Sequence, residues 1–236
     1  MIRPLAPLVL LIAAVSPAGA AGAPRTVSIG SFDRVRVEGA YRVAIVTGGS
    51  PGARIEGEGD DGGPDLRVDG STLVIRRAGL GQWGERGGVV ARGPVTITLS
   101  TPSLSAVTIT GDAEVSVTRM TGPRVALTLG GAGSITVARV DADQLTAQVV
   151  GDGHMTLAGR VATARLAASG AGGIAADALD AGDLTAALQG AGAITARARY
   201  TAQVSSSGLG SVTVAGRPKC RTLGQASGTV RCGMGE

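Results

Sequence analysis

The stretch GGAGSITV at residues 130–137 returns almost unchanged as QGAGAITA at residues 189–196. A glycine-rich string of this kind either holds a ligand, as in a phosphate-binding loop, or turns the chain through backbone angles that other residues avoid. Related strings recur, and their first glycines are 20, 20, 19, 20 and 18 residues apart, with a degenerate copy beginning at Ala226. Such regular spacing indicates a structural repeat. The first glycines are Gly111, Gly131, Gly151, Gly170, Gly190 and Gly208.

The residues after each glycine alternate between apolar and polar. The fourth and sixth residues are apolar or small in every copy, as in Ile135 and Val137, and the residue between them is most often Thr or Ser, as in Thr136. A period of two is typical of a strand that buries one face. Each repeat therefore predicts a strand, a glycine turn, a second strand and a polar return such as residues 140–144.

An amphipathic strand cannot bury its apolar face alone, but copies at a fixed spacing can stack so that equivalent residues pair. The sequence therefore predicts an all-β parallel β-helix (β-solenoid) with about 20 residues per coil and a rise of about 4.8 Å per coil. Residues 175–198 are Ala-rich and have helical propensity. The repeat spacing on both sides of them favours strands instead.

The first part of the chain alternates in the same way but without regular spacing. Examples are YRVAIV at residues 41–46 and VTITL at residues 95–99. We interpret residues 26–107 as the irregular start of the same solenoid, including its N-terminal cap. Residues 24–236 then form a single domain, with regular coils over about 105–232.

The N-terminus predicts export. Residues 1–23 contain Arg3, an apolar run over residues 5–15 and two small-residue sites, which place cleavage after Ala20 or Ala23. The run is too short to span a bilayer comfortably, and no later segment reaches that length. We expect an exported signal-peptide protein, in the periplasm or at the cell surface, without a membrane span after cleavage.

Cys220 and Cys232 are the two cysteines of the chain. An even pair in an exported protein indicates a disulfide bond. Counted from Ala226, they lie six residues before and six after the last turn, both at apolar positions of the repeat. The predicted bond closes the final coil and covers an edge that the end of a solenoid exposes.

Three stretches carry a resemblance to a known family. They are FDRVRVEGAYRVAIVTG at residues 32–48, GSTLVIRR at 70–77 and VTITLSTPSLSAVTITGDAEV at 95–115, followed by the glycine coils. In this order they resemble the head GIN domain family, a bacterial family of unknown function whose description is that of an auto-transporter adhesin. The resemblance covers about residues 30–232 and implies a right-handed parallel β-helix. It implies no catalytic or binding residues.

Ligand-binding interpretations of the glycines fail on local pattern. A phosphate loop places its glycines between a strand and a helix, whereas each string here leads into a strand. A calcium-binding nonapeptide requires Asp at the position of Ile135. His154 is the one histidine, which excludes a His-based metal cluster or a Ser-His-Asp triad, and we expect it to be an exposed turn residue.

Acidic residues offer weaker candidates. Asp112 and Asp152 share a repeat position two coils apart, roughly 9.6 Å, which formally suits an inverting carboxylate pair. Ala132 lies between them, and no aromatic residues are near, so solvated turn acids are favoured. A second group is a candidate cation site, although a charged surface loop is the simpler interpretation. Its members are Glu56, Glu58, Asp60, Asp61 and Asp65.

Trp83 is the best candidate for a contact with a partner. It lies in the segment GLGQWGERGG at residues 79–88, which has the composition of a protruding loop. A lone Trp in such a loop stacks on a sugar or on a protein surface. The alternative is that Trp83 folds back and covers the irregular N-terminal section.

Charge and composition exclude one class of partner. Removal of Arg3 with the signal leaves 21 basic and 18 acidic residues, a net charge of about +3. The basic residues are almost all Arg and are scattered, and aromatics make up 2% of the chain, whereas nucleic-acid binding requires a basic cluster with stacking aromatics. We therefore expect no nucleic-acid partner.

These observations favour a non-enzymatic envelope protein whose solenoid presents a binding or adhesive surface to a polysaccharide or protein of the cell envelope. We expect no catalytic residues, no cofactor and no metal ion. The alternative is a polysaccharide lyase or hydrolase, because β-helix scaffolds also support that chemistry. A third interpretation is homo-oligomeric self-assembly, because stacked flat strands favour pairing at their edges.

Overall fold

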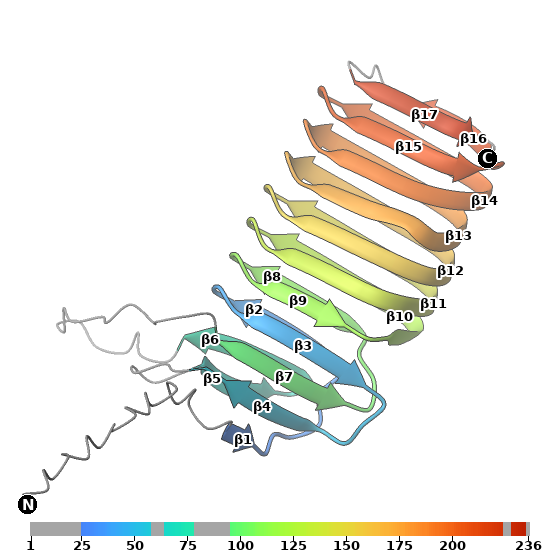
Figure 1. The fold of residues 1–236 in the computed structure, drawn as a ribbon. Coiled ribbons are helices and arrows are strands. Elements are labelled where there is room, and N and C mark those ends of the chain that lie inside the picture. The colour runs from blue at the N-terminus through green and yellow to red at the C-terminus, as the bar shows by residue number, and fades with distance from the viewer. Residues whose placement is uncertain (1–24, 58–63, 78–94, 224–227, 235–236) are drawn as a thin grey trace, which may run out of the picture.

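The computed structural model describes residues 25–57, 64–77, 95–223 and 228–234, and no helix occurs in these ranges. Their strands join one sheet that winds into a β-solenoid of about 6 turns with a spacing of about 20 residues (Figure 1). The predicted all-β solenoid is confirmed. The strands are β1 (Arg25–Val27), β2 (Arg34–Glu38), β3 (Arg42–Thr47), β4 (Gly52–Glu56), β5 (Pro64–Asp69), β6 (Thr72–Arg77), β7 (Thr96–Thr101), β8 (Ala106–Thr110), β9 (Glu114–Val117), β10 (Met120–Gly130), β11 (Ser134–Val150), β12 (His154–Gly170), β13 (Gly173–Gly190), β14 (Ala193–Ser207), β15 (Ser211–Gly216), β16 (Lys219–Leu223) and β17 (Thr229–Met234).

The regular coils stack in chain order. From β10 to β14 each strand pairs in parallel with the next, and equivalent repeat positions lie in register, so that Ile135 pairs with Met155 and Met155 pairs with Ile174. The Ala-rich segment is strand β13 and continues into β14, as the spacing predicts. The fourth and sixth positions after each glycine are 0–3% exposed from Val115 to Val214. These columns form the core, confirming the predicted inner face.

The glycines turn the chain at one edge of the stack. Gly131 has a φ of 120°, and a Cβ at this position would lie 2.5 Å from the carbonyl oxygen of Gly111 in the preceding coil. The same positive φ recurs at the first glycine of each later string. Glycine is required twice over, because other residues avoid this backbone region and because the turns above and below leave no room for a side chain.

The N-terminal strands stack out of chain order. In Figure 1 the blue pair β2–β3 lies between the pair β6–β7 and the pair β8–β9. Val35 therefore pairs with Leu73 on one side and with Val107 on the other. The first glycines of the repeats stack on one another, and we call this column the glycine ladder. Gly39, with a φ of 115°, lies directly below Gly111 and is its first member. The sequence spacing does not reveal this member, because 72 residues separate it from Gly111.

Antiparallel pairs replace the parallel stacking at the N-terminal end. Strand β4 pairs antiparallel with β7, β1 with β4, and β5 with β6. Side chains tie distant segments together where the chain crosses from β7 to β8. The buried hydroxyl of Thr101 donates to the carbonyl oxygen of Phe32, and the hydroxyl of Ser105 donates to Asp33 at 3.0 Å.

The two cysteines form a disulfide at the C-terminal end. Cys220 lies on β16 and Cys232 on β17, and their sulfur atoms are 2.06 Å apart with a Cα–Cα distance of 6.2 Å. Strand β16 pairs with β14, whereas β17 pairs with β15. The predicted bond is confirmed, and it links the two faces of the last coil.

Candidate functional site

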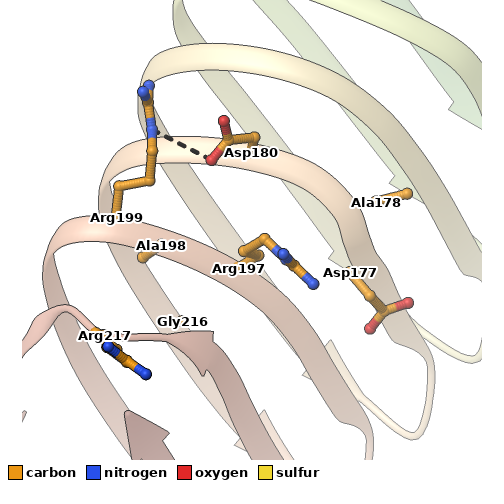
Figure 2. Close-up of a pocket in the computed structure, with 8 residues that line it drawn as sticks. All are labelled: Asp177, Ala178, Asp180, Arg197, Ala198, Arg199, Gly216 and Arg217. Atoms are coloured by element: carbon orange, nitrogen blue, oxygen red, sulfur yellow. Dashed lines mark ion pairs between the residues drawn. The ribbon is translucent and has the colours of Figure 1, made fainter. Parts of the chain in front are cut away.

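A difference in length between two coils creates a concavity on the return side of the solenoid. The pairing of β13 with β14 jumps from Ala176–Ala196 to Asp180–Arg197, so residues 177–179 have no partner in β14. Unpaired residues of this kind bulge from the sheet and bend the strand that carries them. The concavity beside the bulge has a volume of about 620 Å³. Its lining residues are Asp177, Ala178, Asp180, Arg197, Ala198, Arg199, Gly216 and Arg217 (Figure 2).

Three arginines and two aspartates make the concavity a charged site with an excess of one positive charge. The Asp180 carboxylate is 3.2 Å from the guanidinium of Arg199 and 3.6 Å from that of Arg160 in the coil before. In Figure 2 the side chain of Arg197 extends toward Asp177. Asp180 thus holds Arg160 and Arg199 in place, because each ion pair restricts a long side chain.

An aromatic ring lies at the rim of the concavity. Tyr200 is 62% exposed, and the guanidinium carbon of Arg199 is 5.2 Å from the centre of its ring. This distance is within the range of a cation–π contact. The ring also approaches Gly182 of β13, where an added Cβ would lie 3.5 Å from a ring carbon of Tyr200. Tyr200 is therefore an exposed aromatic side chain in contact with one of the lining arginines.

Sequence reasoning missed this site because it treated the arginines as scattered. Aligned on the glycines, however, they all fall on the return, eight or nine residues after the glycine of their coil. That offset was the available signal. Asp141 joins two of them, at 3.5 Å from Arg119 and 4.0 Å from Arg139. The return-side arginines are Arg119, Arg139, Arg160, Arg199 and Arg217.

The structure separates the acidic candidates. Of the predicted cation group, Glu56 pairs with Arg54 at 2.8 Å and Asp65 pairs with Arg67 at 3.0 Å and Arg76 at 3.2 Å. Its other members, Glu58, Asp60 and Asp61, lie outside the described residues. No group of three His, Cys, Asp or Glu side chains is placed to hold a metal ion within the described ranges.

The remaining candidates lie at the edge of the stack formed by the glycine turns, or outside the residues that the structure describes. Asp112 accepts the backbone N–H of Ala132 at 3.3 Å, and Asp152 is exposed on a later turn. His154 is exposed, at a smaller hollow of about 290 Å³ lined mainly by Gly, Ala and Thr. Trp83 lies outside the described residues, and its role as a contact stays a prediction.

No helix with the length and hydrophobicity needed to cross a bilayer occurs in the part of the chain that the structure describes.

The chain matches a known protein family. A family model described as "Putative auto-transporter adhesin, head GIN domain" matches residues 31–218. This range contains strands β2–β15 and the arginine-lined concavity. No curated protein matches the chain.

Solved structures share the fold. A "putative adhesin" from Bacteroides fragilis is 21% identical with a TM-score of 0.78, covering 89% of this chain and 95% of its own. A "putative lipid binding protein" from Parabacteroides distasonis is 17% identical with a TM-score of 0.72, covering 90% and 98%. A "putative adhesin" from Parabacteroides merdae is 15% identical with a TM-score of 0.67, covering 89% and 95%. Identities this low establish the shared solenoid and nothing about ligands.

Proposed function

The chain belongs to the head GIN domain family, and from that premise we propose that it is an exported, non-enzymatic envelope protein whose solenoid presents a binding surface. The arginine-lined concavity is the observation that carries the proposal. It gathers charged side chains from three successive coils at one hollow of the solenoid. Binding sites are concave and combine a few placed polar groups with a rigid scaffold.

The disulfide supports export. Disulfide bonds persist in oxidising compartments such as the periplasm and the cell surface, and thiols stay reduced in the cytosol. The Cys220–Cys232 bond therefore agrees with the predicted signal peptide at residues 1–23. Fractionation of cells that express the full chain tests the compartment. Recovery of the protein in the cytosol with an intact N-terminus would contradict export.

The carboxylates of the concavity suit binding better than glycoside hydrolysis. Hydrolysis requires one carboxylic acid that protonates the leaving group and a second carboxylate that acts as base or nucleophile. Asp180 is instead engaged in ion pairs with both Arg160 and Arg199. The charged groups of the site are therefore arranged for recognition of a charged ligand.

Two assays with the purified mature chain test the function. In the first, retention of the protein on an envelope fraction from the producing organism is measured, and we expect binding that saturates. In the second, the protein is incubated with a panel of polysaccharides and the release of reducing or unsaturated ends is measured. Turnover in the second assay would replace the proposal with the lyase or hydrolase alternative, and absence of retention would remove it.

A Trp83→Ala variant belongs in the first assay. Trp83 is proposed as a second contact on the segment over residues 79–88. A loss of retention with unchanged thermal stability indicates a contact, because a ring that covers the N-terminal section would lower stability on removal. Sedimentation of the same protein tests self-assembly, and a monomer at all concentrations argues against it.

A further inference from the structure

We propose that the concavity beneath the bulge of β13 binds the carboxylate groups of an acidic polysaccharide, with Tyr200 as a platform for a sugar ring. The inference rests on the proposed binding function and specifies its ligand class. Three properties of the site carry it: an arginine without a carboxylate partner, the equivalent positions of Arg199 and Arg217 on successive coils, and the exposed aromatic ring beside Arg199.

Arg217 supplies the available charge. Arg199 is engaged by Asp180 at 3.2 Å, whereas Arg217 is exposed and forms no ion pair with the residues that the structure describes. It lines the same hollow as Arg197 and Arg199. A guanidinium presents its N–H groups as a planar fork that matches a carboxylate in a bidentate arrangement. A carboxylate that enters the hollow can therefore form a bidentate contact with Arg217 and lies near the positive charges of Arg197 and Arg199.

The direction of the arginine row favours a polymer over a small anion. Arg199 and Arg217 occupy equivalent positions of successive coils, because Ala198 pairs with Gly216 and Thr201 pairs with Lys219 on either side of them. Successive coils are about 4.8 Å apart along the axis. On the earlier coils the arginines alternate with acids, because Arg160 pairs with Asp141 on one side and with Asp180 on the other. A polymer with regularly spaced carboxylates can therefore place neighbouring groups at Arg199 and Arg217.

Tyr200 distinguishes a sugar polymer from other polyanions. The residue is 62% exposed beside Arg199, and aromatic rings pack against the apolar faces of sugar rings. Nucleic acid requires several stacking aromatics, and this rim offers one. The uncharged lining residues are Ala178, Ala198 and Gly216, which give little apolar surface to the acyl chain of a lipid.

Binding of polygalacturonate to the mature protein tests the inference. Isothermal titration calorimetry at low ionic strength is run with polygalacturonate, with the neutral polymer dextran, and with vesicles of phosphatidylglycerol and phosphatidylcholine. We expect saturable binding of polygalacturonate that weakens as salt is added, because screening reduces attraction between exposed charges. Binding of dextran with equal affinity, or of the vesicles alone, would overturn the assignment.

Paired substitutions localise the binding. Arg217→Glu reverses the open charge, and Arg124→Glu makes the same change at an exposed arginine of β10, which pairs with Gln144 far from the concavity. We expect Arg217→Glu to weaken polygalacturonate binding at least tenfold and Arg124→Glu to weaken it less than twofold. Tyr200→Leu should weaken it several-fold without changing the salt dependence. Equal loss in the two arginine variants would reduce the effect to net charge and refute the site.

The envelope assay separates this inference from the function it rests on. If the wild-type protein is retained on envelopes and Arg217→Glu is retained equally, the concavity is not the surface used, and the binding function stands. If neither protein is retained and polygalacturonate does not bind, both proposals fail. Circular dichroism of each variant confirms that the fold is intact, because an exposed side chain contributes little to stability.

Discussion

The two halves of the solenoid solve the same stacking problem with different chain paths. In the regular coils each strand pairs with a strand about 20 residues away, and turns of glycine lie directly above one another. In the N-terminal half the β2–β3 pair receives β8–β9 from 72 residues away and β6–β7 on its other side. Register between coils is therefore a property of the strand faces and does not require adjacency along the chain.

The two halves also differ in what holds neighbouring coils together. The regular coils rely on backbone hydrogen bonds and on contacts between glycine turns, such as the Gly131 N–H donating to the carbonyl oxygen of Val150 at 3.0 Å. The N-terminal half adds side-chain bonds across long sequence distances, for example from Arg42 to Glu114 at 3.0 Å. Closing long loops costs conformational entropy, and these bonds offset part of it. The regular half should therefore be sensitive to glycine changes and the N-terminal half to polar changes.

Gly131→Ala should give the largest effect. It combines an unfavourable φ with a Cβ 2.5 Å from the Gly111 carbonyl, so we expect a loss of about 3 kcal/mol or more in unfolding free energy. Gly39→Ala carries the same φ, but its Cβ meets only the Tyr41 ring at 3.3 Å, and a loss of about 1–2 kcal/mol is expected. Urea midpoints measure both. Gly30→Ala, in open space, is the control, and equal losses at residues 39 and 131 would contradict the ladder.

Removal of the disulfide should come next. A covalent loop of this size constrains the unfolded chain by about 2–3 kcal/mol, and the effect should stay in the last coil. Amide hydrogen exchange of the Cys220→Ser/Cys232→Ser variant measures it strand by strand. We expect faster exchange in β16 and unchanged exchange in β12, which serves as the internal reference. Uniform acceleration would show that the coils unfold as one unit.

Thr101→Val tests the crossover from β7 to β8. It removes a buried hydroxyl that donates to the carbonyl oxygens of Phe32 and Ser103 and keeps the side-chain shape. We expect a loss of about 1–2 kcal/mol, because the Phe32 acceptor stays buried without its donor. Thr136→Val, an exposed change of the same kind in a regular coil, is the matched control and should stay within about 0.5 kcal/mol. Equal losses would remove the distinction between the two halves.

Acid should weaken the N-terminal half slightly before the regular coils. The Ser71 hydroxyl bonds to the Asp33 carboxylate and lowers its pKa below the ordinary value, with burial opposing and the Ser105 hydroxyl adding to the shift. A depressed folded pKa adds stability above the unfolded pKa, and this stability is lost as the pH falls below about 4. Asp33→Asn should remove this pH dependence at a cost below about 0.5 kcal/mol, because the side chain is 41% exposed. Unfolding at pH 7 and pH 3 measures it, and an unchanged slope would contradict the assignment.

The fold can be predicted from the sequence where each coil repeats the same residue pattern at the same distance. Ile135 and Val137 are buried as their period predicts, because each coil repeats the same pattern at the same distance. Gly39 does not fit the 20-residue spacing, because strands β4–β7 lie between it and its partner Gly111 in the chain. Long-range pairing leaves no periodic trace in the chain.

The candidate site is predictable only in part. Arg199 and Arg217 share an offset from their glycines, so their alignment along one side is readable from the sequence. The hollow they line arises because residues 177–179 of β13 have no partner in β14, where the equivalent segment is shorter. The difference in length is seen only when the two coils are compared. Tyr200 is recognised as part of the site from the contact between its ring and Arg199, which the sequence does not show.

The stacked glycine turns allow one coil to be duplicated without disturbing the coils on either side. Because each interior turn presents the same backbone to the turns on either side, a gene duplication of one coil would lengthen the rod by about 4.8 Å and leave strands β1–β7, the disulfide and the concavity unchanged. The β2–β3 coil does not have this freedom, since it is held between strands that lie later in the chain. Variation in length among relatives should therefore accumulate between Gly111 and Gly170 and spare both ends.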